Sequence, residues 1–390
     1  MTIHSPRDGA MTKPIARRPK DRKAQILDAA RTLVVSDGYA NVSMAQIADE
    51  VGITAGALYR HFANKAVLLA AVIGTSFDDV MPVDQDDDRL RDVVEAACRS
   101  VVARPDVGVL WWRESRSLPD DLRAELAARL REVNQRYARL IRVERGDVDD
   151  RASRELAWGV QAILASPGFH ATRLPPADYV DLLTSACLRV CAVTPGPADA
   201  SRRRRGGGLT PVSKREAMLG HAIELFARNG YDATSLSDIG AAAGVSGPNT
   251  YSYFASKSEL MEVCLDRGTT ALWLTLHDVL AENDEPRRAL AAVVRSYARL
   301  AVDKTILTPV LGTDVVGHSD SVRARQREYV AEWTGLVVAS RPELTEIGAR
   351  LRVHTALGLI NILTRIDHLA ESGSFESDLA AMAIAVLLHA

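Results

Sequence analysis

Two stretches of this chain repeat each other at a fixed separation. Residues 43–65 read SMAQIADEVGITAGALYRHFANK, residues 235–257 read SLSDIGAAAGVSGPNTYSYFASK, and the two align without a gap at an offset of 192 residues. That period is the length of a domain, which excludes a solenoid of short repeats. The repeat therefore predicts two copies of one folding plan within a chain of 390 residues.

Each stretch contains the signals of two short helices joined by a tight turn. Ser43 followed by Gln46 fits a capping box at a helix start, and apolar residues then recur at helical spacing. Gly52 can adopt the positive φ that follows a last helical turn, and Thr54 can cap a second helix. Two short helices at a glycine-containing turn form the DNA-reading unit whose second helix enters the major groove. The second copy has its corresponding signals at Ser235, Gly244 and Ser246.

One lysine recurs just after each helix-turn-helix. Lys65 and Lys257 follow the predicted caps Asn64 and Ser256, so each lies in the first turn of the next helix. A cation at this position faces the positive end of the helix dipole, which costs about 0.3–1 kcal/mol, whereas a phosphate in front of the helix makes the position favourable. A tolerated surface lysine is the alternative, but its recurrence in both copies favours the phosphate contact.

Both stretches resemble the DNA-binding domain of the TetR family of bacterial transcriptional regulators. The family signature runs from Gly52 to Lys65 and from Gly244 to Lys257, and the second copy departs from it at Thr250. The resemblance implies an all-α protein made of two tandem TetR-like units. Each unit has a three-helix DNA-binding head and a helical-bundle body for effector binding and dimerisation. It also implies a transcriptional regulator, most commonly a repressor.

The expected organisation follows from the repeat and from composition. The body helices are expected at 88–103, 106–117, 119–144, 150–165 and 177–193, and then at 286–303, 305–316, 319–340, 343–369 and 375–388. In the family the last two body helices pack against those of a partner, and the apolar stripes available here are Ala157, Val160 and Leu164 with Leu183, Cys187 and Val190. The predicted domains are 1–20, a disordered basic arm; 21–66, the first helix-turn-helix domain; 67–193, the first body; 194–212, an Arg/Gly/Pro linker; 213–258, the second helix-turn-helix domain; and 259–390, the second body.

Charge and composition narrow the function class. The net charge is −2, but residues 13–65 hold nine Lys/Arg against five Asp/Glu and residues 202–257 hold eight against four, so each head is near +4. This asymmetry is typical of nucleic-acid binding. No nucleophile–base motif, metal constellation or phosphate loop is present, so we expect neither an enzyme nor a cofactor or metal. The four cysteines are expected to be packed thiols, and the lack of a signal peptide or bilayer-spanning run predicts a cytoplasmic protein.

The resemblance also assigns DNA contacts to individual positions. Base contacts are expected at Ala55, Gly56, Ala57 and Arg60 in the first head and at Gly247, Pro248, Asn249 and Ser252 in the second. Phosphate contacts are expected at Tyr59, His61, Lys65, Tyr251, Tyr253 and Lys257, with Ser43, Thr54, Ser235 and Ser246 at the helix starts. Arg17 and Arg18 either follow the DNA or merely solubilise the arm.

The two heads in one chain predict an internal pseudodimer. TetR-family proteins place two identical heads in successive major grooves, about 34 Å apart. Here the reading helices differ, since Arg60 suits guanine and Asn249 suits adenine, so an operator with two unequal half-sites is expected. Higher association remains open. An architectural or partner-binding protein with one active head is the alternative, because Gly247 and Pro248 weaken the second reading helix.

A tryptophan-rich stretch in the first body is the candidate effector site. Trp111, Trp112, Arg113 and Arg116, with Trp158, could line a pocket, although large aromatic residues in a helical bundle more often form core. The second body shows no equivalent cluster. Residues 18–23 and 110–114 and the tandem plan also resemble mycobacterial tandem regulators of this family that control mce lipid-transport operons. That likeness implies a hydrophobic effector, such as an acyl-CoA, lipid or sterol-like compound.

Overall fold

The computed structural model describes residues 19–80, 89–197, 211–231, 233–303 and 320–388. In these ranges the regular secondary structure is helical throughout, which confirms the all-α prediction. None of the described helices is long and apolar enough to cross a membrane. The expected helix at 305–316 and the arm residues Arg17 and Arg18 lie outside the described residues.

The first head forms as the capping signals predict. The Ser43 side chain accepts from the Gln46 backbone N–H and the Gln46 side chain returns to Ser43, which completes the predicted capping box. Gly52 ends the helix with φ of 68°, in the left-handed region that glycine adopts without strain. The head consists of α1 (Pro19–Asp37), α2 (Met44–Val51) and α3 (Ala55–His61), and α4 (Lys65–Val80) then enters the body.

The second head repeats this plan with a shorter reading helix. The helices are α10 (Lys214–Asn229), α11 (Leu236–Ala242), α12 (Gly247–Thr250) and the long α13 (Lys257–Glu282). The hydroxyl of Thr250 donates to the Gly247 carbonyl oxygen at 2.5 Å, and that of Ser252 donates to the Asn249 carbonyl oxygen at 2.7 Å. Gly247 also has a low helix propensity, and α12 has four residues where α3 of the first copy has seven.

The bodies follow the expected helix order with two differences. The helix expected at 106–117 breaks at Arg113 into α6 and a 3-10 turn, and the Ser115 hydroxyl donates to the Trp111 carbonyl oxygen across the break at 2.5 Å. The helix expected to reach residue 369 ends at Leu363, where the Thr364 hydroxyl takes the last carbonyl oxygens. The first body contains α5 (Leu90–Ala103), α6 (Asp106–Trp112), η2 (Glu114–Ser117), α7 (Asp120–Glu144), α8 (Asp150–Ala165), η3 (Ser166–Phe169) and α9 (Pro176–Cys191); the second contains α14 (Pro286–Val302), α16 (Asp320–Ser340), α17 (Glu346–Leu363) and α18 (Phe375–Leu388).

The two bodies pack on each other through their last two helices. Helix α8 contacts α17, α9 contacts α18, and the buried apolar residues of both bodies form one continuous core. At Gly159 of α8, a Cβ atom would lie 2.7 Å from Val190 Cγ1 and 3.0 Å from Met382 Sδ, so glycine permits the close approach of α9 and α18. The predicted packing of these helices is confirmed. Cys98, Cys187, Cys191 and Cys264 are buried and free, as predicted.

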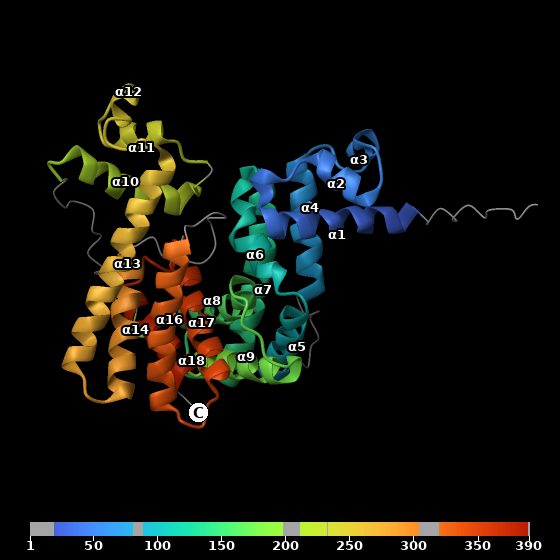
Figure 1. The fold of residues 1–390 in the computed structure, drawn as a ribbon. Coiled ribbons are helices and arrows are strands. Elements are labelled where there is room, and N and C mark those ends of the chain that lie inside the picture. Colours follow the sequence, from blue (N-terminus) through green and yellow to red (C-terminus); the bar gives the residue numbers. More distant parts are fainter. Residues whose placement is uncertain (1–18, 81–88, 198–210, 232, 304–319, 389–390) are drawn as a thin grey trace, which may run out of the picture.

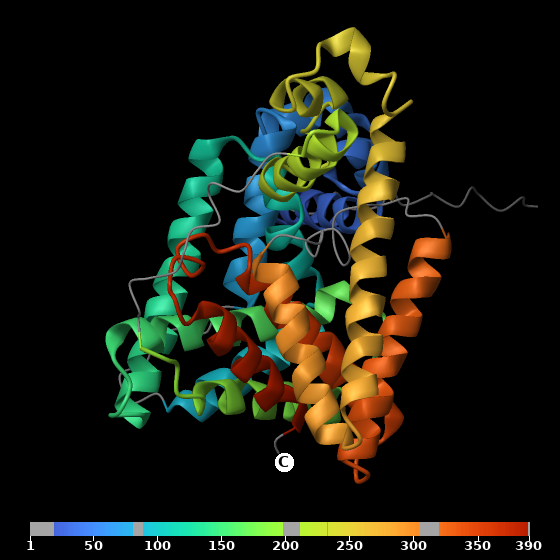
Figure 2. The same cartoon turned by 90° about the vertical axis from the view of Figure 1, so that its left-hand side faces the viewer.

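Both heads lie at the same end of the molecule. Figure 1 shows α3 and α12 above the packed bodies, and the view in Figure 2 places both heads at that end again. The arrangement resembles two subunits of a dimer that are joined into one chain.

Candidate nucleic-acid interface

The reading helix of the first head presents an exposed polar face. The Thr54 side chain caps α3 by accepting from the Ala57 backbone N–H at 3.2 Å, and Leu58 is fully buried beneath it. Tyr59 is 52% exposed, although an aromatic side chain of this size is usually covered in a monomer. The exposed predicted contacts of this head are Ser43, Thr54, Ala55, Gly56, Tyr59, Arg60 and His61, and Ala57 is half-buried.

The second head presents a similar face around α12. Thr250 and Phe254 are buried and hold the helix, whereas Tyr251 is 64% exposed and Tyr253 is 36% exposed. Tyr59 and Tyr251 occupy corresponding places in the two copies, so both heads keep an exposed tyrosine beside the reading helix. The other exposed predicted contacts are Ser235, Ser246, Pro248, Asn249 and Ser252, and Gly247 is half-buried.

The repeated lysines contact tyrosine rings within their own heads. Lys65 Nζ lies 4.0 Å from the centroid of the Tyr39 ring, and Lys257 Nζ lies 4.1 Å from that of Tyr231. Lys257 Nζ also donates to the Tyr231 carbonyl oxygen at 2.8 Å. Burial lowers the pKa of Lys65, and the charge of Glu114 opposes that shift. The ring thus fixes each ammonium at the start of the helix that leaves the head.

Tyr39 and Tyr231 were not recognised as functional from the sequence. The signal was present, because Gly38–Tyr39 and Gly230–Tyr231 match at the same offset of 192 residues. Both glycines have positive φ, 83° and 84°, and so turn the chain to bring each tyrosine over its lysine. The spacing alone does not reveal the ring contact.

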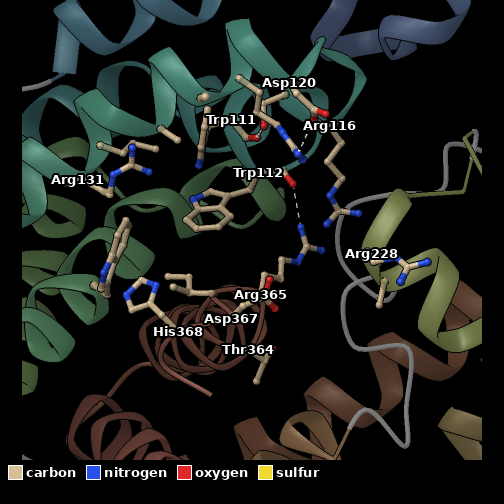
Figure 3. Close-up of a pocket in the computed structure, with 18 of the residues that line it drawn as sticks. Trp111, Trp112, Arg116, Asp120, Arg131, Arg228, Thr364, Arg365, Asp367 and His368 are labelled. Carbon is tan, nitrogen blue, oxygen red and sulfur yellow. Dashed lines mark hydrogen bonds and ion pairs between the residues drawn. The ribbon is translucent and has the colours of Figure 1, made fainter. Parts of the chain in front are cut away.

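The structure brings four of the five candidate effector residues together. Trp111, Trp112, Arg116 and Trp158 line a cleft of about 990 Å³ between the first body, the second head and the end of α17 (Figure 3). Arg113 instead lies at the junction of the first head and body. Its guanidinium pairs with Glu114 at 2.5 Å and donates to the Val35 carbonyl oxygen at 2.9 Å.

The second body, in which the sequence shows no equivalent of this tryptophan cluster, also borders a cavity. A second cavity of about 730 Å³ is lined by α13, α14, α16 and α17 and by the segment 169–172 of the first unit. The aromatic pattern of the first body did not predict it, because its lining residues, which include five arginines and two tyrosines, are scattered along the chain. A smaller cavity of about 70 Å³ in the first body is lined by Phe77, Trp111 and Tyr137, among others. The arginines of the second cavity are Arg323, Arg325, Arg327, Arg350 and Arg365, and its tyrosines are Tyr297 and Tyr329.

Two helix-turn-helix heads on packed helical bodies define a DNA-binding regulator built of two units. The family model of bacterial regulatory proteins of the tetR family matches residues 26–72 and again residues 219–264, and the tetracyclin repressor-like C-terminal domain matches residues 84–165. The chain therefore belongs to the TetR family of transcriptional regulators, as a tandem member. Members of this family are not enzymes.

Individual relatives match over shorter lengths. The transcriptional activator FasR of Mycolicibacterium smegmatis is 34% identical over 98 residues, which are 25% of this chain and 45% of FasR. The repressor KstR of Mycobacterium tuberculosis is 34% identical over 61 residues, 16% of this chain and 28% of KstR. The chain thus covers less than half of either relative. A TetR-family regulator structure from Bordetella parapertussis matches with 23% identity and a TM-score of 0.41, over 46% of this chain and 96% of that one.

Proposed function

We propose that this chain is a sequence-specific transcriptional regulator that binds an asymmetric, pseudo-palindromic DNA operator as a single-chain pseudodimer. The observation that carries the proposal is that two different reading helices lie at one end of a molecule whose two bodies share one core. In this proposal the inter-unit packing of α8 and α9 with α17 and α18 sets the separation of the heads. Double-stranded DNA is the partner, and the cytoplasm is the place of action.

The two half-sites differ in this proposal because the reading side chains differ. Arg60 is exposed on α3 and can donate two hydrogen bonds to guanine, while Asn249 is exposed on α12 and can pair with adenine. Tyr59 and Tyr251 contribute phosphate contacts that set affinity and register. Lys65 and Lys257 add charge at a helix start that is ready for a phosphate.

The proposed regulation is release from DNA by a small hydrophobic effector. The support is the cleft that brings Trp111, Trp112 and Trp158 together beside Arg116. We propose a lipid, acyl-CoA or sterol-like compound, in keeping with the resemblance to tandem regulators of lipid-transport operons. Repression is the proposed direction, because a protein that occupies an operator and leaves it on effector binding blocks transcription until the effector arrives.

Head-specific variants test the two-headed proposal on a duplex found by binding-site selection. Tyr59→Ala with Arg60→Ala disables the first head, and Tyr251→Ala with Asn249→Ala disables the second; all four side chains are exposed, so folding is unaffected. Each pair is expected to weaken binding at least tenfold, as each removes a base contact of about 1–3 kcal/mol. Full binding by the second pair would establish the one-headed architectural alternative and contradict the proposal.

The effector proposal has its own measurement. Acyl-CoAs, free fatty acids and sterols are titrated into the protein–operator complex, and DNA release is followed by fluorescence anisotropy. We expect one of these classes of compound to release DNA from the wild-type protein but not from the Trp112→Ala variant. If none releases DNA and none raises the melting temperature, effector-controlled repression is wrong, while the two-headed DNA binding stands on its own test.

A further inference from the structure

The cleft of Figure 3 is built from three separate parts of the molecule. Trp112 lies at the end of α6 in the first body, and the Arg365 guanidinium, from just after α17, donates to the Trp112 carbonyl oxygen at 2.9 Å. Trp158 of α8 lies edge-on to His368, with 6.2 Å between ring centroids. The third wall is α10 of the second head, which contributes Ile223 and Arg228 among others. Aromatic surface thus faces a wall that belongs to a DNA-binding head.

The lining favours an anion. Five arginines face the cleft against three carboxylates, and one of the three, Asp120, already pairs with Arg123 at 3.1 Å. Guanidinium groups bind carboxylate, phosphate and sulfonate oxygens in pairs, and tryptophan rings accept flat or chain-like apolar groups. A volume of about 990 Å³ admits a ligand of drug or cofactor size. The lining therefore suits an amphipathic organic anion, with an apolar body and a charged group.

The second head depends little on the body for its own packing. Its described core is made of residues from α10, α11, the turns that follow them and the first part of α13, up to Leu265. One of its approaches to the first body is at Gly230, where a Cβ atom would lie 3.9 Å from Arg116 Cδ. A ligand between Trp112 and α10 would add contact area between this head and the first body.

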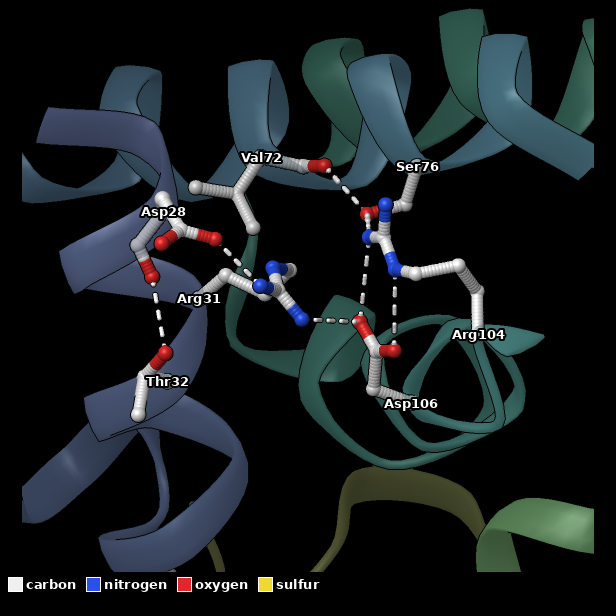
Figure 4. Close-up of polar contacts among 7 residues, drawn as sticks. All are labelled: Asp28, Arg31, Thr32, Val72, Ser76, Arg104 and Asp106. Atoms are coloured by element: carbon white, nitrogen blue, oxygen red, sulfur yellow. Dashed lines mark hydrogen bonds and ion pairs between the residues drawn. The ribbon is translucent and has the colours of Figure 1, made fainter. Parts of the chain in front are cut away.

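The first head is fixed to its body by other means (Figure 4). Arg31 of α1 donates to Asp106 Oδ2 at 3.2 Å, and Arg104 donates to Asp106 Oδ1 at 3.2 Å. Burial alone would raise the pKa of Asp106, but the hydrogen bonds and charges of Arg104 and Arg31 outweigh it and lower the pKa. The Tyr39 backbone N–H also donates to Glu114 Oε2 at 3.0 Å. The core of this head continues into the body through Val107, Leu110, Leu118 and Leu126.

We propose that the cleft between the first body and α10 binds an amphipathic organic anion, and that the bound ligand positions the second head without acting on the first. The evidence for the binding site is the lining of the cleft, whereas its regulatory consequence rests on the proposed function. Occupancy would change the contact of the second head with its half-site, and because tight binding needs both heads, this change weakens binding of the whole chain to the operator.

The probe for this site is 1-anilinonaphthalene-8-sulfonate, an aromatic sulfonate, with N-phenyl-1-naphthylamine as the matched neutral compound that lacks the sulfonate. Trp112→Leu is expected to weaken binding of both compounds. Arg116→Gln with Arg131→Gln is expected to weaken the sulfonate about tenfold and leave the neutral compound unchanged, because charge-assisted contacts alone are removed. Arg350→Gln, in the second cavity, is the control and is expected to leave this binding component unchanged.

Hydrogen–deuterium exchange of the full chain without DNA reports which head responds. The sulfonate is expected to protect amides of α10 and α6, to leave those of α1 unchanged, and to lose this effect in the Arg116→Gln, Arg131→Gln variant. Protection of both heads or of neither would overturn the proposal, as would equal loss of binding in Arg350→Gln. Because no DNA is present, this measurement tests the binding site independently of operator binding. If the sulfonate protects α10 but no ligand releases DNA, the site stands and effector control of DNA binding is wrong.

Discussion

Glu155 of α8 and Asp378 of α18 are buried carboxyl groups from the two units, and each keeps one oxygen without a hydrogen-bond partner among the described residues. The other oxygens are held: Glu155 Oε2 pairs with Arg151 at 2.9 Å, and Asp378 Oδ1 accepts from the Gly196 backbone N–H at 2.8 Å. Burial and the charge of Asp378 raise the pKa of Glu155 to about 7, although Arg151 opposes the shift. The joint between the units therefore contains a carboxyl group that titrates near neutral pH.

This pair predicts that the contribution of Glu155 to stability falls as the pH rises toward neutrality. A carboxyl group whose pKa is higher in the folded chain than in the unfolded one contributes stability below the unfolded pKa of about 4.3, and this contribution is lost as pH rises through about 7. The loss is on the order of 2–3 kcal/mol. Denaturant unfolding at pH 5 and pH 8 measures it. Glu155→Gln is expected to shift the stability difference between pH 8 and pH 5 in favour of pH 8 by this amount, and Glu346→Gln, in an exposed pair with Arg350, is expected to leave the difference unchanged. An unchanged difference in Glu155→Gln would refute the assignment.

A second prediction concerns the close packing at Gly159. Gly159→Ala places a Cβ atom on α8 that lies 2.7 Å from Val190 Cγ1 of α9 and 3.0 Å from Met382 Sδ of α18. These side chains or their helices must therefore shift away from α8. We expect a loss of about 1–3 kcal/mol of stability and weaker operator binding, since the same packing holds the two heads at their separation. Gly335→Ala on α16 is the matched control, because nothing lies within 4 Å of its Cβ position. Thermal unfolding and operator titration of both variants test this prediction. If Gly159→Ala and Gly335→Ala have the same stability and the same operator affinity, the close packing at Gly159 is not needed for either.

A third prediction separates the second head from the first. A Cβ atom at Gly240 would lie 2.6 Å from Thr250 Cγ2, whereas the first head has Ala48 and Leu58 at the corresponding positions. Gly240→Ala is therefore expected to destabilise the second head by about 1–3 kcal/mol and weaken one half-site. Adding Thr250→Ser removes the clashing methyl group and is expected to restore part of both, because Thr250 Oγ1 still lies 3.0 Å from the Cβ position. Gly220→Ala in α10, whose Cβ position is open, serves as the control for amide exchange in this head. A harmless Gly240→Ala would show that the reading helix shifts freely.

The sequence predicted the parts that depend on local signals. The helix at 150–165 was predicted with its observed bounds, because Asp149 caps it and the apolar stripe ends with it. Ser43, Gly52 and Ser235 likewise act through neighbours a few residues away. Gly247 and Pro248 predict a weakened second reading helix, and α12 is indeed shorter than α3, with four residues against seven.

The features that the sequence did not show depend on packing between distant segments. Arg113 lies between Trp112 and Glu114 in the chain, yet its guanidinium contacts α1 rather than the cleft. The second cavity depends on segment 169–172 of the first unit meeting helices of the second. The Lys65 contact with the Tyr39 ring depends on the turn at Gly38. The periodicity or spacing of residues within one segment does not predict such contacts between distant segments.

The central claim is that one chain reads one operator with two different heads. The mass of the protein–operator complex, measured by light scattering on a duplex found by binding-site selection, tests it most directly. The account predicts a complex of one 42.3 kDa chain per duplex, on a site with two unequal half-sites. Two chains on a short symmetric palindrome would mean that like heads pair between chains, and would contradict the single-chain pseudodimer.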